Sequence, residues 1–178
     1  MAARCGLLPS DDPRWQGDLR HYRLPGGIPI PLFAAVAAQP AVLAELRSET
    51  RNALTGTSPV RFREIVVLRI CARAGCWPEW DVHVVLFAQA AGLNQADLLG
   101  IRTGQLMSHE HDGLAIRLAD AAISNEMDDR LWEGLSAAGS PDQVIEWITL
   151  AGQYVKVCWM SIALAVPRPS IGSEGGPR

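Results

Sequence analysis

Lysine is nearly absent from this 178-residue chain: fifteen of its 16 basic residues are arginine, and Lys156 is the exception. The net charge of −3 excludes the basic excess typical of nucleic-acid binding, so we expect no nucleic-acid partner. No apolar run reaches the roughly 18 residues that a membrane span requires, so we expect no membrane contact. Residues 1–13 contain no apolar core of a secretory signal, which predicts a cytoplasmic protein.

Paired cysteines are missing as well. The four cysteines form no CxxC pair and have none of the spacings of a zinc site; they are Cys5, Cys71, Cys76 and Cys158. In a cytoplasmic chain they are most simply free thiols. The chain also contains no GxSxG sequence and no glycine-rich phosphate loop, so neither a serine hydrolase nor a phosphate-binding loop is supported.

Proline and glycine divide the chain into three parts. Residues 1–30 are rich in both and predict an irregular N-terminal arm, whose Trp15, His21 and Tyr22 we expect to pack on the body or on a neighbouring subunit. Residues 31–166 predict a helical domain, and the Pro/Gly/Ser-rich residues 167–178 predict a flexible tail. Since 48% of the residues are hydrophobic, one domain of this length can bury a sizeable core.

Apolar residues recur at helical spacing through this domain, with no strand–helix alternation and no internal repeat. The pattern predicts a compact all-α fold of about seven helices. We expect helices to begin near residue 31 and to cover 40–54, 58–73, 78–91, 94–104, 113–124, 129–138 and 140–165. Asn94 with Asp97, and Ser140 with Gln143, have the spacing of capping boxes at two helix starts.

The predicted helix at 78–91 gathers the residues best suited to chemistry. At about 100° per residue, one stripe contains Cys76, Glu79, Trp80, His83 and Phe87. Glu79 lies four residues before His83, so it can contact and orient the imidazole. Cys76 precedes the helix, where backbone N–H groups favour a thiolate. The stripe predicts proton transfer near neutral pH. The structural alternative is a Glu–His pair on a solvated helix face and a cysteine that is simply a small core residue.

Glu64 is a second candidate, on the predicted helix at 58–73. It lies on the apolar side of that helix with Val60, Val67, Leu68 and Cys71, whereas the arginines at 63, 69 and 73 fall in other sectors. A carboxylate on an apolar side must be protonated, hydrogen-bonded or paired. Its role is therefore either functional or structural, the structural alternative being a bond to an arginine such as Arg61.

These residues and their spacing resemble the carboxymuconolactone decarboxylase and alkyl hydroperoxidase D-like superfamily. The resemblance covers residues 31–166, and its specific part lies between 63 and 104. The matching motifs are Arg63-Glu64, Gly75-Cys76, Glu79-Trp80 followed by His83, and Ala91-Gly92-Leu93 before a short capped helix. The resemblance implies an all-α fold of the alkyl hydroperoxidase D type and a homo-oligomer, either a trimer or a hexamer.

The hydroperoxidase branch of that superfamily uses a glutamate, a CxxC pair and a histidine. Glu64, Cys76 and His83 stand at the matching positions, but Glu79 replaces the second, peroxide-attacking cysteine. Without two thiols, the disulfide cycle of a peroxidase cannot close within this motif. The departure favours the decarboxylase branch, which works without a metal, a flavin or any other cofactor.

The decarboxylase branch implies a lyase or isomerase that performs acid–base chemistry on a small carboxylated or lactone-like substrate. His83 would donate the proton and Glu79 would orient it, while Glu64, kept neutral by burial, would hydrogen-bond an enolate or lactone oxygen. The residues expected to line the substrate pocket are Cys76, Trp80 and Phe87.

Two alternatives to this interpretation stay open. One is a thiol peroxidase that uses Cys76 with an external or distant thiol. The other is a non-enzymatic binding or assembly protein on the same fold, in which Glu64, Glu79 and His83 would not converge.

Three further groups receive structural interpretations. Residues 108–112 contain His109 and His111, which point to opposite sides of a helix and have no third ligand at a recognisable spacing, so we expect a polar loop and no metal. Lys156 is expected to pair with a carboxylate or to extend to solvent rather than to form a Schiff base. The residues expected at helix interfaces, more than in a substrate cavity, are Trp147, Tyr154 and Trp159.

Overall fold

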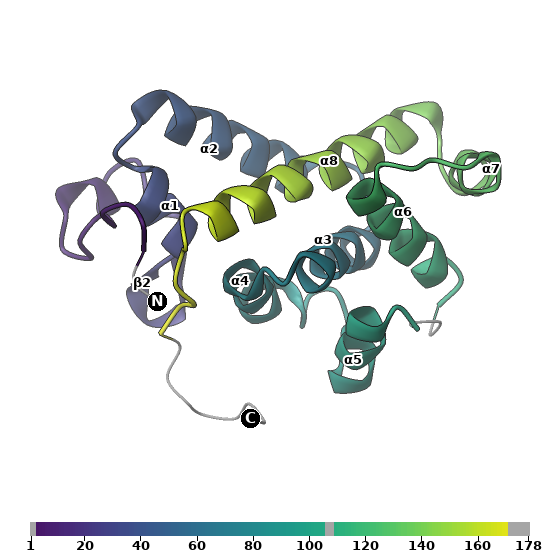
Figure 1. Ribbon diagram of the computed structural model, residues 1–178, viewed down its shortest axis with the longest axis horizontal. Helices are drawn as coiled ribbons and strands as arrows, with labels where there is room; N and C mark the ends of the chain where they lie inside the picture. The colour runs from purple at the N-terminus through teal and green to yellow at the C-terminus, as the bar shows by residue number, and fades with distance from the viewer. Residues whose placement is uncertain (1–2, 106–108, 171–178) are drawn as a thin grey trace.

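The computed structural model describes residues 3–105 and 109–170, which form eight α-helices preceded by a short sheet (Figure 1). Within the N-terminal arm, the 3₁₀ turns are Pro13–Trp15 and Pro25–Gly27, and the strands are β1 (Arg23–Leu24) and β2 (Ile28–Pro29), paired antiparallel. The helices are α1 (Pro31–Val36), α2 (Pro40–Thr55), α3 (Val60–Ala74), α4 (Trp77–Phe87), α5 (Gln95–Thr103), α6 (Asp112–Ser124), α7 (Asp129–Ala138) and α8 (Pro141–Ala163). The expected all-α fold is confirmed. None of the described helices is long and apolar enough to cross a bilayer.

Helix α3 lies at the centre of the molecule. It contacts α4, α5, α6 and α8, which surround it (Figure 1). A helix enclosed in this way must be apolar on most of its circumference. Its fully buried aliphatic side chains are Ile65, Val66, Val67, Leu68 and Ile70.

Both predicted capping boxes are present. The Asn94 side chain accepts hydrogen bonds from the first turn of α5, and Ser140 caps α8 with Gln143 as its reciprocal partner. Helix α4 is shorter than expected, because it ends at Phe87 and the chain then turns. The turn closes with a 2.9 Å hydrogen bond from the Leu93 N–H to the Ala88 carbonyl, and it ends the helix before residue 91.

The N-terminal arm packs on the body of its own chain. Trp15 and Leu19 are buried, and the Trp15 indole donates a 2.9 Å hydrogen bond to the Pro9 carbonyl. Tyr22 stacks on Phe33 of α1 with ring centroids 4.0 Å apart. At the other end of the chain, Arg168 pairs with Asp81 of α4, and the rest of the predicted tail, residues 171–178, lies outside the described residues.

Arg73 of α3 is exposed, but Arg63 and Arg69, which lie outside the sector of Glu64, do not reach solvent. Both are buried, because neighbouring helices cover every side of α3. Arg69 pairs with Asp120 of α6 at 2.7 Å and donates to the carbonyls of Ile101 and Arg102 at the end of α5. One arginine therefore fastens three helices together.

We expect Arg69→Met to lower the free energy of unfolding by about 2–4 kcal/mol, because it removes the nearest cationic partner of Asp120 and a donor to two carbonyls at the end of α5, and leaves only Arg73, at 3.4 Å, beside Asp120. Arg117→Met is the matched control. Arg117 and Asp128 are 43% and 71% exposed, and such a surface pair contributes less than about 1 kcal/mol. Urea denaturation of both variants measures the difference; equal stability losses would contradict it.

Candidate active site

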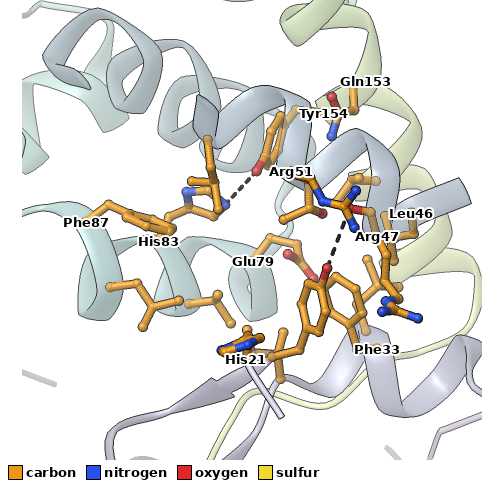
Figure 2. A pocket seen from close by; sticks show the side chains of 18 of the residues that line it. His21, Phe33, Leu46, Arg47, Arg51, Glu79, His83, Phe87, Gln153 and Tyr154 are labelled. Carbon is orange, nitrogen blue, oxygen red and sulfur yellow. Dashed lines mark hydrogen bonds between the residues drawn. The ribbon is translucent and has the colours of Figure 1, made fainter. Parts of the chain in front are cut away.

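A cavity of about 330 Å³ opens between the N-terminal arm and helices α1, α2, α4 and α8 (Figure 2). Aliphatic and aromatic side chains form much of its wall; they include Leu32, Phe33, Leu46, Val82, Leu86 and Phe87. Three ionisable groups from α4 and α8 line it as well, namely Glu79, His83 and Tyr154. Two arginines of α2, Arg47 and Arg51, and His21 of the arm add basic groups to the lining.

A chain of hydrogen bonds connects the core to this cavity. His83 Nδ1 lies 2.7 Å from Glu64 Oε2, and His83 Nε2 lies 3.0 Å from the Tyr154 hydroxyl (Figure 2). Glu64 belongs to α3, His83 to α4 and Tyr154 to α8, so the chain crosses three helices. An ionised Glu64 selects the tautomer with a proton on Nδ1, which leaves Nε2 free to accept the Tyr154 proton.

Glu64 is held as a carboxylate. Burial raises the pKa of Glu64, but His83 and the hydrogen bond from Arg63 lower it by more, so the net shift is downward. The Arg63 Nε–H donates to Glu64 at 2.8 Å, and both side chains are buried. The expectation of a neutral Glu64 is therefore wrong, and the arginine bonded to it is Arg63 rather than Arg61.

Glu79 differs from Glu64 in the direction of its pKa shift. Burial raises the pKa of Glu79, and the opposing effects of His83 and Ser161 are too small to cancel that rise. Its Oε1 accepts a 3.0 Å hydrogen bond from the Ser161 hydroxyl of α8. Both His83 nitrogens bond elsewhere, so the expectation that Glu79 orients His83 is wrong. The contact with His83 therefore belongs to Glu64, and the raised pKa belongs to Glu79.

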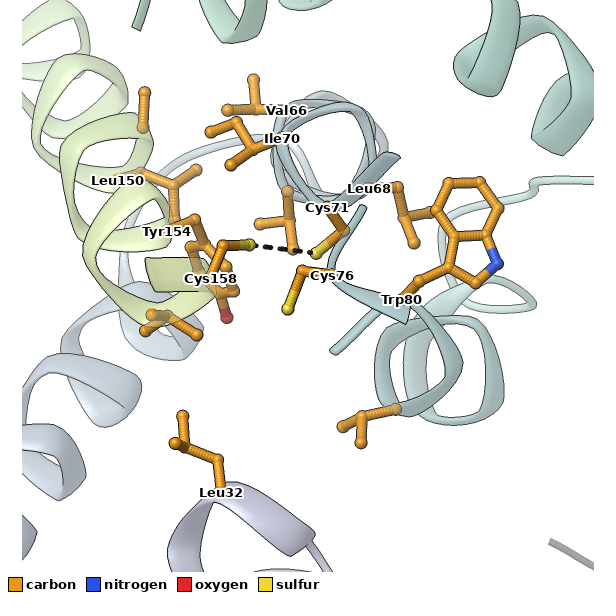
Figure 3. Packing of buried hydrophobic residues seen from close by; sticks show 14 of the residues in the cluster. Leu32, Val66, Leu68, Ile70, Cys71, Cys76, Trp80, Leu150, Tyr154 and Cys158 are labelled. Carbon is orange, nitrogen blue, oxygen red and sulfur yellow. Dashed lines mark hydrogen bonds between the residues drawn. The ribbon is translucent and has the colours of Figure 1, made fainter. Parts of the chain in front are cut away.

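Cys76 and Trp80 lie outside the cavity lining, contrary to expectation, whereas Phe87 is part of it. The Cys76 thiol is fully buried and faces Cys71 and Cys158, whose sulfurs are 3.8 Å apart (Figure 3). The neighbouring Cys158 and burial raise the pKa of the Cys76 thiol, so the expected thiolate is also wrong. Burial outweighs the effect of the nearby helix N-terminus.

Comparison with solved structures relates this architecture to a known one. A protein of unknown function from Agrobacterium tumefaciens, described as a candidate antioxidant defence protein AhpD, superposes with a TM-score of 0.69. The match has 17% sequence identity and covers 76% of this chain and 96% of the other. The chain has the AhpD-like fold. No protein-family model matches the sequence, and no curated protein matches it.

In this AhpD-like fold, sequence analysis missed the residues that complete the site. Tyr154 was expected at a helix interface more than in a substrate cavity; it lies between α8 and α4, where it bonds His83, and it also lines the cavity. Ser161 follows Tyr154 by seven residues, so both occupy one face of α8. The seven-residue spacing could have shown that Tyr154 and Ser161 share a face of α8. Only the packing of α8 on α4 shows that this face meets Glu79 and His83.

The remaining candidates have structural partners. Lys156 pairs with Glu45 and Glu49 of α2, as expected, and although burial lowers the pKa of Lys156, these carboxylates raise it by more. His111 is the cap of α6, and Ser108 lies outside the described residues. Within the described part of the chain, no three His, Cys, Asp or Glu side chains are grouped as a metal site.

The raised pKa of Glu79 makes stability depend on pH. Between about pH 4.3 and its folded-state pKa, Glu79 keeps a proton that the unfolded chain loses, so stability falls as pH rises. We expect Glu79→Gln, which keeps the acceptor for Ser161, to remove this loss. Its advantage over wild type should grow by up to about 1.4 kcal/mol per pH unit.

Urea denaturation between about pH 5 and about pH 8 measures this slope. Glu133→Gln is the control, because Glu133 is exposed on α7 and should leave the slope of wild type unchanged. A constant difference between Glu79→Gln and wild type would show that Glu79 is ionised in the folded protein.

Proposed function

We propose that the protein is an enzyme that moves a proton on a small carboxylated or lactone-like substrate, as a lyase or isomerase. The observation that carries this proposal is the hydrogen-bonded chain Glu64–His83–Tyr154, which ends in the cavity that Glu79 also lines. The pKa of Glu64 is lowered and that of Glu79 is raised, and two carboxyl groups whose surroundings shift their pKa values apart are characteristic of acid–base sites.

Tyr154 is the group that exchanges the proton with the substrate. Burial raises the pKa of Tyr154 well above its ordinary value, so the phenol is neutral and does not act as a standing base. Its oxygen accepts a proton from the substrate as its own proton passes to His83 Nε2. The ionised Glu64 stabilises the imidazolium that results. The reverse transfer returns a proton to the substrate carbon.

Glu79 stabilises the negative charge that develops on the substrate. As a neutral acid in an apolar wall, it donates a hydrogen bond to the oxygen on which enolate charge develops. In a decarboxylation, the electron pair of the breaking C–C bond moves into this enolate as CO₂ leaves. Because loss of CO₂ from a carboxylate consumes one proton, His83 first takes up a proton from solvent as an imidazolium beside the ionised Glu64. Tyr154 then donates its proton to the carbon and regains one from His83 Nε2.

The lining of the cavity supports the substrate class. Its apolar wall fits the hydrocarbon skeleton of a small molecule, and the guanidinium groups of Arg47 and Arg51 attract a carboxylate. Arg47 lies 3.7 Å from Asp18 of the arm, so this pair joins the arm to α2 at the edge of the cavity. The arm therefore contributes to the shape of the site.

The same contacts weigh against both alternatives. A thiol peroxidase requires an accessible thiolate, but burial and the neighbouring Cys158 favour the neutral Cys76 thiol outside the cavity. A non-enzymatic protein predicts that the three candidate residues do not converge. Here Glu64 bonds His83, and His83 and Glu79 line one cavity.

We expect Tyr154→Phe and Glu64→Gln each to lower turnover of the true substrate by about 100-fold or more, because each interrupts the relay. A panel of carboxylated lactones, assayed for CO₂ release and for deuterium uptake from solvent, identifies the substrate. Tyr154→Phe keeps the ring in place, so circular dichroism should be unchanged.

Cys76→Ala is the control that distinguishes acid–base chemistry on a lactone from thiol peroxidase chemistry. It should leave lactone turnover unchanged, because Cys76 does not reach the cavity. Loss of a peroxide-dependent activity in Cys76→Ala, with full activity in Tyr154→Phe, would instead establish a thiol peroxidase.

A further inference from the structure

A second space, distinct from the active-site cavity, lies between α2 and α8. It consists of two adjoining hollows of about 130 Å³ and about 320 Å³, which share Asn52, Thr149 and Gln153 and together form the α2–α8 groove. The other polar residues that line it are Glu49, Ser58, Arg63, Glu146 and Lys156. Asn52 and Thr149 are exposed, so the groove opens to solvent. A space of this size with polar walls has room for several water molecules.

The α2–α8 groove reaches both ends of the Glu64–His83–Tyr154 relay. Arg63, which is buried, lines the groove and donates to Glu64 at 2.8 Å. Gln153 lines the groove and the active-site cavity alike, and it directly precedes Tyr154 in α8 (Figure 2). Gln153 therefore lies at the boundary between the solvent-filled groove and the space that the substrate would occupy.

The relay needs a proton that the substrate does not supply. Decarboxylation consumes one proton, which His83 takes up, but His83 is only 5% exposed and its two nitrogens bond Glu64 and Tyr154. A substrate bound in the cavity covers the Tyr154 hydroxyl and displaces water from the apolar wall. A proton that arrives while the substrate is bound must therefore take a path outside the cavity.

The charges along the groove favour the entry of a proton. Burial raises the pKa of Glu146, but hydrogen bonds from Thr57 and Ser58 lower it by more, so Glu146 is ionised. The two cations of the groove are already paired, Lys156 with two glutamates of α2 and Arg63 with the residue that follows it. The excess charge of the lining is therefore negative, and it attracts protons and small cations.

We propose that the α2–α8 groove delivers the proton that each decarboxylation consumes, and that Gln153 is the positioning residue that holds the connecting water. This inference rests on the proposed function. The Gln153 amide both donates and accepts hydrogen bonds, so it can hold a water between the groove and Tyr154. A hydrated proton passes along this water to the Tyr154 oxygen as the Tyr154 proton moves to His83 Nε2, which leaves His83 as the imidazolium.

Steady-state kinetics of the full chain, on the carboxylated lactone that wild type decarboxylates, test this route. Gln153→Leu and Thr149→Phe should each lower kcat about 10-fold with little change in KM, because each closes the groove with an apolar side chain. Proton delivery then limits the rate, so the solvent deuterium isotope effect on kcat should increase in both variants. Thr149 lines the groove and not the cavity, so its loss of activity cannot come from a lost substrate contact.

Two further variants separate the route from a structural effect. Gln153→Ala leaves a gap that water can fill, so its kcat should stay above that of Gln153→Leu. Gln89→Leu is the matched control, because Gln89 is exposed beyond the end of α4 and lines neither the groove nor the cavity. It should have the kcat and the isotope effect of wild type. Circular dichroism of each variant shows whether the fold is retained.

The failure of this inference can be told apart from the failure of the proposed function. A wild type that turns over no carboxylated lactone would contradict the proposed function, and the route with it. Wild-type kcat and isotope effect in Gln153→Leu and Thr149→Phe would overturn the route alone, because the proton would then enter through the cavity. An increase in KM in Gln153→Leu, with Thr149→Phe unaffected, would also overturn it and would make Gln153 a substrate contact.

Discussion

The enclosure of α3 by four other helices is the constraint on which the rest of the structure depends. A helix buried on all sides has no solvent for its charged residues, so each must find a partner inside the protein. Arg61 pairs with Asp112, Arg69 with Asp120, and Glu64 with Arg63 and His83. These contacts hold α4, α5 and α6 in place around α3, and the last of them forms the base of the candidate active site.

The candidate site contains two buried glutamates that have different neighbours. Glu64 has a guanidinium and an imidazole within hydrogen-bonding distance, and its pKa is lowered. Glu79 has a hydroxyl as its hydrogen-bond partner, and burial raises its pKa. Burial therefore raises the pKa of both carboxyl groups, and the nearest neighbours decide whether the net shift is upward or downward. The buried thiols of Cys71, Cys76 and Cys158 lie beside one another, and burial contributes to the raised pKa of each.

Helix α8 supplies two of the side chains that complete the candidate site. It presents Tyr154 to His83 and Ser161 to Glu79. The N-terminal arm closes the opposite side of the cavity through His21 and Tyr22.

The sequence by itself determined the all-α class, both capping boxes and the placement of Glu79 and His83 on one side of a helix, because helical periodicity and capping are local properties. It also predicted that Lys156 pairs with carboxylates. It could not assign the protonation states of Glu64 and Glu79, nor find Tyr154, because these follow from contacts between residues 19 to 82 positions apart. Only the packing of α3, α4 and α8 decided which neighbour each carboxyl group has, and a pKa in a buried site is set by its neighbours.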